Sequence, residues 1–272
     1  MWACPYCRLE LHANDDARSL FCAGGHAFDR AREGYVNLLP PNRKHSRDPG
    51  DNAAMVAARR RVHSADIYRP LADAVVAQLA AEQVRGRVLD LGCGEGYYTQ
   101  YLVAALSHTA VIGVDISRSA ARLAAKTCPG AHIAVASAFD LPVTDGSVDA
   151  AVRIFAPSDD SELVRVLRPG GCYLEVSPGP RHLWQLREGL YDTPREHATA
   201  REGISGMTLL HSAELQYELQ PEPGQLADII GMTPFAYRAD KVRREMLLAS
   251  QLSTLTMAFS LRMFCIGAQV YD

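Results

Sequence analysis

Long hydrophobic runs are missing from this sequence of 272 residues. No apolar stretch reaches the roughly 18 residues that a membrane-spanning helix needs, and no basic region followed by an apolar one stands at the N-terminus. Internal repeats and low-complexity tracts are missing as well. We therefore expect a soluble cytoplasmic protein with no membrane partner. Its 48% hydrophobic content is enough for one core of about 180 residues plus smaller appended parts.

The chain also lacks a strong excess of charge. Its formal net charge is only -3, so the whole molecule is not a polycation, and any contact with nucleic acid has to come from a local basic surface. Six basic residues in one region could form that surface: Arg43, Lys44, Arg47, Arg59, Arg60 and Arg61. The alternative for the three consecutive arginines is a solvated helix face, which is the commoner case.

A disulfide framework is not indicated. Seven cysteines is an odd number, and four of them are scattered with no pairing pattern, namely Cys93, Cys128, Cys172 and Cys265. The remaining cysteines form two short knuckles with the spacings C-x2-C and C-x3-H, which are Cys4-Pro5-Tyr6-Cys7 and Cys22-Ala23-Gly24-Gly25-His26.

Three thiolates and one imidazole complete a tetrahedral zinc site. A segment this short cannot hold itself together by apolar burial, so zinc would supply much of its folding energy. We predict a zinc ion bound by Cys4, Cys7, Cys22 and His26. Unligated reduced thiols are one alternative, and His12 as the fourth ligand is another.

The most informative segment is a glycine-rich loop between a predicted strand and a predicted helix. Val88-Leu89-Asp90-Leu91 is followed by glycines at positions 92, 94 and 96. Glycines let the backbone turn sharply and approach a ligand closely, and the helix that follows directs its free N–H groups at a polar group. The dinucleotide pattern Gly-x-Gly-x-x-Gly/Ala is not met, because Tyr97 occupies the last position.

A carboxylate follows the next predicted strand. Val111-Ile112-Gly113-Val114 ends in Asp115, 19 residues after Gly96, where an acid can accept hydrogen bonds from both hydroxyls of a ribose. The loop, Asp115 and Asp90 together resemble the first motif and the acidic loop of class I S-adenosylmethionine-dependent methyltransferases. We therefore expect S-adenosylmethionine as the cofactor, with Asp90, Gly92, Gly94, Gly96 and Asp115 at its site.

Short apolar segments alternate with helical ones from residue 87 onward. Strands are predicted at 87–91, 110–115, 132–136, 148–155 and 171–177, with helices at 97–106, 118–126 and 159–167 between them. Such alternation specifies an α/β fold, a parallel sheet covered by helices with ligands at the carboxyl ends of its strands. With the glycine loop, it predicts the Rossmann-like class I methyltransferase fold with a small N-terminal zinc ribbon.

Three regions divide the chain. We expect a zinc-binding module at 1–36, a linker and basic helix at 37–69, and the methyltransferase domain at 70–272. Ser117 and Ser158 are predicted N-caps of the helices that follow them. The last apolar run, Met257 to Ile266, is expected to form an antiparallel edge strand, and residues 180–250 are expected to be helical in part.

Six segments in the same order resemble one family over nearly the full length. Besides the zinc knuckles, they are residues 33–40, 46–51, 91–99, 178–183 and 232–235. The chain is similar to the bacterial 23S rRNA guanine-N1 methyltransferases, in their Gram-negative form. The resemblance assigns zinc to the four predicted ligands. It also implies that four residues contact the cofactor, namely Tyr68, Gly94, Glu95 and His182.

The resemblance further implies methyl transfer to guanine N1 in an rRNA hairpin, with 23S rRNA or a large-subunit precursor as partner. The Asp/Asn-Pro-Pro-Tyr/Phe pattern of amino-group methyltransferases is replaced here by Arg153-Ile154-Phe155-Ala156-Pro157. We expect Phe155 to stack on the base and Arg153 to meet its O6 oxygen. The alternative for Phe155 is an ordinary core residue.

Two other functions remain as alternatives. A small-molecule C- or O-methyltransferase would have much the same central domain, although the zinc ribbon and the arginines argue against it. A non-enzymatic zinc-ribbon RNA-binding protein is the second, but the intact glycines and Asp115 give no sign of decay. The oligomeric state is open, with a homodimer as one alternative.

Overall fold

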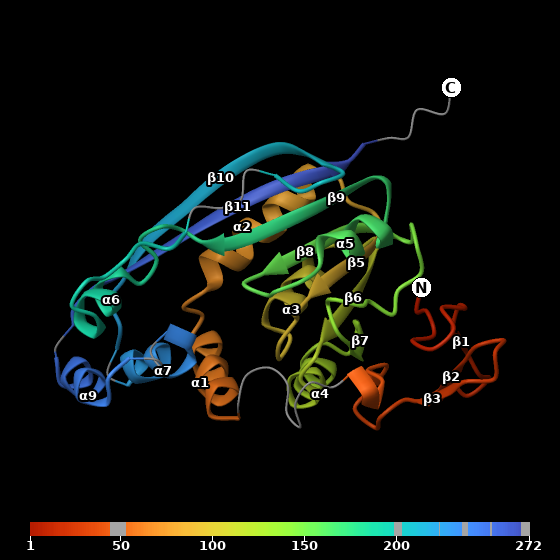
Figure 1. Cartoon of the computed structure of the whole chain (residues 1–272), viewed down its shortest axis with the longest axis horizontal. Coiled ribbons are helices and arrows are strands. Elements are labelled where there is room, and N and C mark those ends of the chain that lie inside the picture. Colours follow the sequence, from red (N-terminus) through yellow and green to blue (C-terminus); the bar gives the residue numbers. More distant parts are fainter. Residues whose placement is uncertain (44–52, 199–202, 223, 236–238, 251, 268–272) are drawn as a thin grey trace.

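The computed structural model describes residues 1–43, 53–198, 203–222, 224–235, 239–250 and 252–267. Its center is an eight-stranded sheet in the order β10-β11-β9-β8-β5-β6-β7-β4 (Figure 1). The strands are β4 (Val36–Asn37), β5 (Gly86–Leu91), β6 (Thr109–Asp115), β7 (His132–Val135), β8 (Val148–Ile154), β9 (Leu167–Pro178), β10 (Met207–Leu219) and β11 (Leu255–Ile266).

The predicted parallel part of this sheet is confirmed. Strand β5 pairs in parallel with β6 on one side and with β8 on the other, and β7 and β9 extend the parallel set in the two directions. The strand order reverses at β5, so a crevice forms at the carboxyl ends of β5 and β8, where ligands of doubly wound folds bind. The glycine loop leaves β5 at this point.

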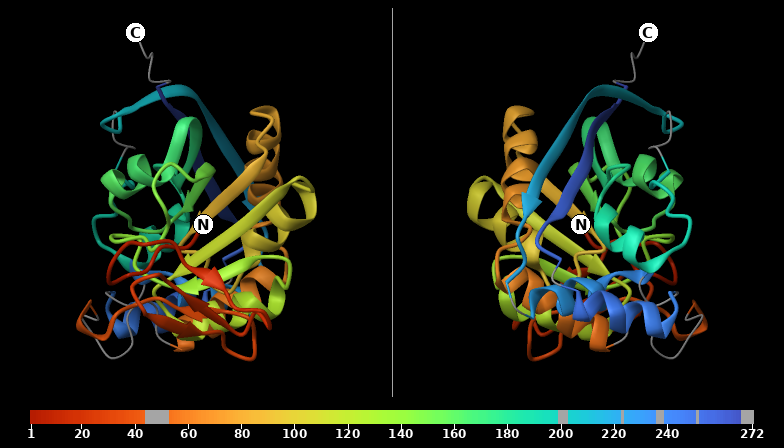
Figure 2. Two further views of the ribbon diagram at one scale, coloured as in Figure 1. Left: turned by 90° about the vertical axis from the view of Figure 1, so that its right-hand side faces the viewer. Right: turned by 90° about the vertical axis from the view of Figure 1, so that its left-hand side faces the viewer.

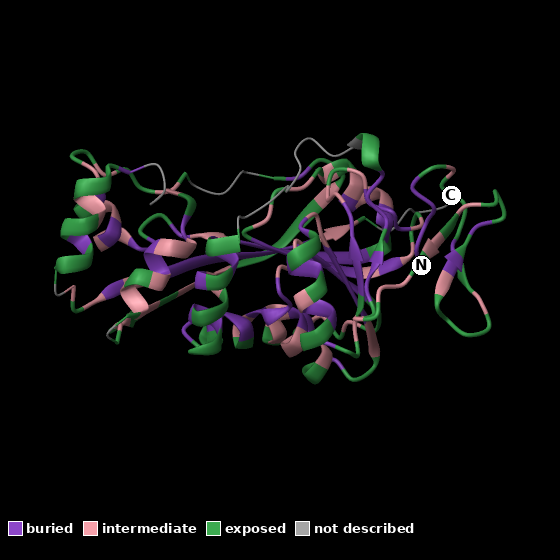
Figure 3. Cartoon of the chain, turned by 90° about the horizontal axis from the view of Figure 1, so that it is seen from below, coloured by how far each residue is buried: buried purple, intermediate pink, exposed green. Residues whose placement is uncertain are grey.

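Alternate side chains of the strands face two different cores. Val88 and Val152 belong to a cluster with the helices α2 (Arg69–Ala81) and α3 (Tyr97–Ala105), whereas Leu89 and Ala151 pack with α5 (Asp160–Val166) and the N-terminal segment. Figure 2 shows α2 and α3 on the opposite side of the sheet from α5. The strands are therefore buried between two layers, and the outward faces of the helices are exposed (Figure 3).

The remaining helices complete the molecule. They are α1 (Ala53–Ser64), α4 (Arg118–Thr127), α6 (Trp184–Leu190), α7 (Gln225–Met232) and α9 (Lys241–Ala249), with a short 3-10 turn at Pro41–Arg43. Helix α1 packs against α7 although the two are far apart in the sequence (Figure 1). Within the described ranges, none of the helices is both long and apolar enough to cross a bilayer.

Two predictions about individual elements are wrong. Strand β11 is antiparallel as expected, but it lies between β9 and β10 and is not the edge. The edge on that side is β10, which lies within the region expected to be helical in part. Ser117 caps α4 as predicted, whereas α5 is capped by Asp159, whose carboxylate accepts a hydrogen bond from the Ser161 N–H, and not by Ser158.

The N-terminal segment forms a small sheet of three strands, β1 (His12–Ala13), β2 (Ser19–Phe21) and β3 (Ala27–Asp29), at one end of the molecule (Figure 1). Strand β4 then joins the main sheet beside β7. The expected module boundary at residue 36 thus falls inside a strand of the main sheet. Trp2 and Cys4 are buried in the same cluster as Leu89 and Val114.

Candidate functional site

The two cysteine knuckles meet at one point of the N-terminal segment. The Sγ atoms of Cys4, Cys7 and Cys22 and the Nδ1 atom of His26 all lie within 4.8 Å of one another. Nδ1 is 3.5, 3.6 and 3.4 Å from the three sulfurs, and the Cys7 and Cys22 sulfurs are 3.6 Å apart. The edges of a tetrahedron around zinc, with bonds of about 2.0 to 2.3 Å, have nearly this length. The four residues fit a zinc ion.

His12, the alternative fourth ligand, stands elsewhere. It is exposed on β1 and is not part of the cluster of ligand atoms found in the described part of the chain.

The glycine loop after β5 has the open backbone that its sequence predicts. Gly92 and Gly94 have φ angles of 72° and 56°, in the left-handed region that favours glycine. A Cβ atom at Gly92 would lie 2.4 Å from the Cβ of Ala156, whereas one at Gly94 would meet nothing within 4 Å. The first glycine is therefore needed for close packing, and the second leaves one face of the loop open to a ligand.

Asp115 ties this loop to the end of β6. One of its oxygens accepts a hydrogen bond from the Gly94 N–H at 2.9 Å, and the other accepts one from the Ser117 N–H at 2.7 Å. The carboxylate is thus fixed in orientation at the carboxyl end of β6, and Asp115 lines the cavity described next.

A cavity of about 780 Å³ opens in front of this loop. This volume lies in the range of small-molecule and cofactor sites. Seven of the residues predicted for the cofactor and the base line it: Tyr68, Gly92, Gly94, Glu95, Asp115, Phe155 and His182. They come from five separate places in the chain, and the fold brings them together.

Two predicted cofactor residues, Asp90 and Gly96, do not line the cavity. The Asp90 carboxylate is buried and accepts a hydrogen bond from the Thr99 hydroxyl at 2.7 Å. Burial raises its pKa to about 6, and the Thr99 hydrogen bond opposes that shift. At Gly96, which precedes α3, a Cβ would lie 3.0 Å from the Ala124 backbone. Both residues therefore stabilise the loop through contacts that do not face the cavity.

Helix α1 contributes side chains that the sequence did not reveal. His63 is buried, and its Nδ1 forms a short contact with the Glu95 carboxylate. Its ring stacks on Tyr97 with centroids 4.1 Å apart and an interplanar angle of 14°. Burial raises the pKa of Glu95, but the hydrogen bond and charge of His63 outweigh it, so this pKa lies below its usual range. Glu95 is thus held as a carboxylate at the cavity wall.

The other end of the cavity is aromatic. Phe155 is 42% exposed and has a φ of 56°, a strained conformation for a residue that is not glycine. It is therefore not an ordinary core residue. Its ring faces that of His182 at 6.4 Å with an interplanar angle of 22°. Phe139 and Phe235 line the same cavity.

Two imidazoles lie at this aromatic end: His182 is buried and His197 is half-buried. Burial and the nearby Arg187 charge lower the pKa of His182 to about 3 and that of His197 to about 4. The His182 Nδ1 accepts a hydrogen bond from the Ala258 N–H at 3.3 Å. Both rings are therefore neutral near pH 7 and offer hydrogen bonds without charge. Sequence reasoning missed His197, whose only signal is its type.

Arg153 belongs to a buried network of ion pairs. Its guanidinium is buried, contacts the Glu175 carboxylate and donates to the Ser158 hydroxyl at 2.7 Å. Glu175 also pairs with Arg262 on β11. Arg153 is absent from the described residues that line the cavity, and through Glu175 it links β8 to β9 and β11.

The arginines expected to form one basic surface have different surroundings in the structure. Arg59 lines the cavity, whereas Arg60 is exposed, and Arg61 forms a bidentate pair with Asp228 on α7. Lys44 and Arg47 lie outside the described residues, and Arg43 ends the 3-10 turn that precedes them.

Comparisons with known proteins match both the N-terminal segment and the central domain. A zinc-ribbon family model described as "RlmA, N-terminal" matches residues 2–47, and a methyltransferase domain model matches residues 88–171. A solved structure titled "Conversion of a Disulfide Bond into a Thioacetal Group during Echinomycin Biosynthesis" has a TM-score of 0.51 at 20% identity. It covers 72% of this chain and 82% of its own, and shows a common fold.

Two curated relatives match over most of their length. The "23S rRNA (guanine(748)-N(1))-methyltransferase" of Streptomyces fradiae is 32% identical over 87% of this chain and 86% of its own. The "Putative 23S rRNA (guanine-N(1)-)-methyltransferase" of Micromonospora griseorubida is 32% identical over 96% of this chain and 95% of its own. The fold is that of a class I methyltransferase with an N-terminal zinc ribbon, its cofactors are S-adenosylmethionine and Zn²⁺, and the chain belongs to the 23S rRNA guanine-N1 methyltransferase family.

Proposed function

We propose that this protein transfers a methyl group from S-adenosylmethionine to N1 of a guanine in a hairpin of 23S rRNA. One observation supports this most directly: a single cavity joins the glycine loop and Asp115 to an aromatic end with two neutral histidines. The first end suits a nucleoside cofactor, and the second suits an unstacked base.

The cofactor end follows from the loop geometry. Asp115 accepts the ribose hydroxyls, and the open face of Gly94 allows close approach of the ligand. Glu95 places a negative charge near the positively charged methionine portion. Tyr68 and His182, whose ring centroids are 6.5 Å apart, line the cavity beside each other. The bound cofactor supplies an already activated methyl group, so the protein's task is to position the acceptor and exclude water.

At the other end, Phe155 presents an exposed ring on which guanine can stack, and Phe139 and Phe235 enclose the base further. The neutral rings of His182 and His197 are available for the edge of the base that carries N1 and O6. Buried hydrogen-bonding groups of this kind discriminate strongly against a base with the wrong edge.

RNA binding is assigned to the zinc module, to the exposed Arg60 on α1, and to Arg43, Lys44 and Arg47, which precede α1 in the sequence. Phosphate contacts give affinity, and a splayed base gives specificity. Such a substrate places the reaction in the cytoplasm, on 23S rRNA or a large-subunit precursor, with the enzyme as a monomer or homodimer.

The comparisons also bear on which form of the family this chain resembles and which guanine it methylates. The two curated relatives come from the Gram-positive organisms Streptomyces fradiae and Micromonospora griseorubida, and one is named for guanine 748. The similarity to these two relatives favours guanine 748 as the target over the neighbouring guanine that the Gram-negative form would select.

Methyl transfer to rRNA isolated from a strain that lacks the enzyme tests the proposal. Radiolabel from the cofactor should enter 23S rRNA, and mapping should place it on N1 of one guanine, which also identifies the position. Phe155→Ala should lower turnover while cofactor affinity measured by calorimetry changes little. Label found only in small molecules, or RNA binding without label, would contradict the proposal.

A further inference from the structure

The segment from Ser137 to Thr144 connects the cavity to the zinc module. Its first three residues, Ser137 to Phe139, line the cavity. Its later residues pair with the N-terminus: the Ala3 N–H donates to the Pro142 carbonyl at 2.9 Å, and the Thr144 N–H donates to the Met1 carbonyl at 3.1 Å. One short stretch of chain is therefore in contact with both sites.

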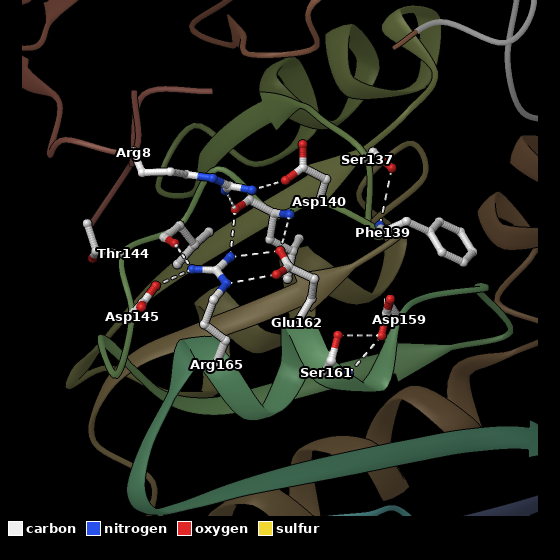
Figure 4. A network of polar contacts seen from close by, with 12 residues as sticks. Arg8, Ser137, Phe139, Asp140, Thr144, Asp145, Asp159, Ser161, Glu162 and Arg165 are labelled. Atoms are coloured by element: carbon white, nitrogen blue, oxygen red, sulfur yellow. Dashed lines mark hydrogen bonds and ion pairs between the residues drawn. The ribbon is translucent and has the colours of Figure 1, made fainter. Parts of the chain in front are cut away.

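The center of this segment is clamped from two sides (Figure 4). The Leu141 carbonyl accepts a hydrogen bond from Arg8 Nη1 at 2.8 Å and another from Arg165 Nη2 at 2.9 Å, while its N–H donates to the Glu162 carboxylate at 2.5 Å. Arg165 and Glu162 belong to α5, and Arg8 belongs to the zinc module. Arg8 also pairs with Asp140, the residue that follows the cavity wall.

The position of Arg8 depends on the zinc knuckle. Arg8 directly follows the ligand Cys7 and has a φ of 61°, which is uncommon for a residue with a side chain. Its N–H donates to the carbonyl of Cys4, the other ligand of the knuckle, at 2.9 Å. A metal ion that fixes both cysteines keeps this turn closed, and a segment this short has little else to hold it.

The ion pair itself contributes little. The Arg8 side chain is 43% exposed and that of Asp140 is 24% exposed, so solvent weakens their attraction. The hydrogen bond to the Leu141 carbonyl is the stronger tie, since Leu141 is fully buried. Because α5 still holds Leu141 from the other side, loss of Arg8 should loosen the cavity wall without unfolding it.

We propose that Arg8 is a positioning residue through which bound zinc fixes the wall at Ser137 to Phe139 and so raises the affinity for the cofactor. The proposal rests on the proposed function, in that the cavity is the cofactor site.

The test is the dissociation constant of S-adenosylhomocysteine, measured by calorimetry on the full chain without RNA. Arg8→Ala should bind about three- to tenfold more weakly than the native protein, the range expected for one lost hydrogen bond. Arg18→Ala is the matched control, because Arg18 is in the same module, 85% exposed, and pairs only weakly with Asp16 at 3.7 Å. It should bind like the native protein. Zinc content is measured for every variant.

Two further measurements separate this role from a general loss of structure. A zinc chelator should weaken binding to the native protein, and should have a smaller additional effect on Arg8→Ala, where the link is already broken. In turnover, Arg8→Ala should raise the cofactor KM more than it lowers kcat.

The proposal is overturned if Arg8→Ala retains its zinc and binds the ligand as tightly as the native protein. Glu95→Gln distinguishes this failure from that of the site itself. Weaker binding by Glu95→Gln with unchanged binding by Arg8→Ala would reject only the role of Arg8, whereas unchanged binding by Glu95→Gln would reject the cavity as the cofactor site.

Discussion

The carboxyl group of Asp90 is ionisable but buried. Because burial raises its pKa to about 6, the native state holds the proton more tightly than the unfolded chain does. The tighter binding of this proton stabilises the native state by roughly 3 kcal/mol below about pH 4. This stabilisation is lost as the pH rises through 6. We expect the stability of Asp90→Asn not to fall with rising pH in this way, because asparagine has no ionisable carboxyl. Its amide oxygen can still accept the hydrogen bond from Thr99.

Urea unfolding of the cofactor-free protein between pH 4 and pH 7 measures the effect. The difference in unfolding free energy between the variant and the native protein should grow in favour of the variant as the pH rises. Parallel pH profiles would show that Asp90 titrates normally.

His63 provides a second test at the scale of one residue. His63→Ala removes the donor to the Glu95 carboxylate, so the pKa of Glu95 should rise and cofactor affinity should fall about tenfold. The loss should be larger at lower pH, where the freed carboxyl is protonated. Calorimetric titration with the cofactor product measures both effects.

Two variants control for packing in this experiment. His63→Asn restores a donor at nearly the position of Nδ1 and should recover much of the affinity. Val62→Ala, a buried neighbour on α1 that lies outside the cavity, should lower stability and leave cofactor affinity unchanged. Equal losses of affinity in His63→Ala and Val62→Ala would indicate a packing effect alone.

The sequence could predict Asp115 and the glycines because each acts within a local pattern of strand, turn and helix. It could not predict His63, since this residue meets Glu95 across 32 positions of the chain and nothing in its neighbourhood marks the partner. The ion pair of Arg153 could not be predicted for the same reason. A charged residue at the end of a strand can face a ligand or a buried carboxylate, and Glu175 on the next strand decides between them.

At the scale of elements, α1 and α7 form one wall of the cavity and approach each other closely. A Cβ atom at Gly231 would lie 3.2 Å from that of Ala58. Gly231→Val should therefore push the helices apart, cost about 1 to 3 kcal/mol of stability and weaken cofactor binding. Denaturant unfolding and calorimetry measure these two effects.

Gly203→Val is the matched control for this substitution. A Cβ at Gly203 meets nothing within 4 Å, and its φ is not in the left-handed region, so stability and binding should stay close to native values. If both variants were equally destabilised, the cause would be the valine itself and not the contact between the helices.

Some elements could be predicted from local sequence patterns and others could not. The parallel strands are buried on both faces and form short apolar runs, which stand out between amphipathic helices. Strand β10 is different: it is exposed along much of its length and contains residues such as Glu214 and Leu215 that favour helices. Its strand conformation is imposed by pairing with β11 over twelve positions. Pairing of this kind is not visible in local propensity.

At the scale of the whole molecule, the zinc module and the sheet share one hydrophobic cluster. Trp2 is 2% exposed and packs in the cluster that contains Leu141 and Val143. We therefore expect the segment before the predicted boundary at residue 36 to unfold together with the sheet. Zinc bound at the knuckles should stabilise the entire chain by mass action, since the four ligand atoms come together in the folded module.

We accordingly predict a single unfolding transition that zinc removal shifts as a whole. Scanning calorimetry should show one peak with zinc and one peak at lower temperature with a chelator. Trp2→Ala should destabilise this single transition by about 3 to 5 kcal/mol, because it opens a cavity between the module and the sheet. Leu9→Ala, in the same module but 47% exposed, should cost less than about 1 kcal/mol. Two separate peaks, with only the smaller one responding to the chelator or to Trp2→Ala, would mean that the module unfolds on its own and that the shared cluster does not couple it to the sheet.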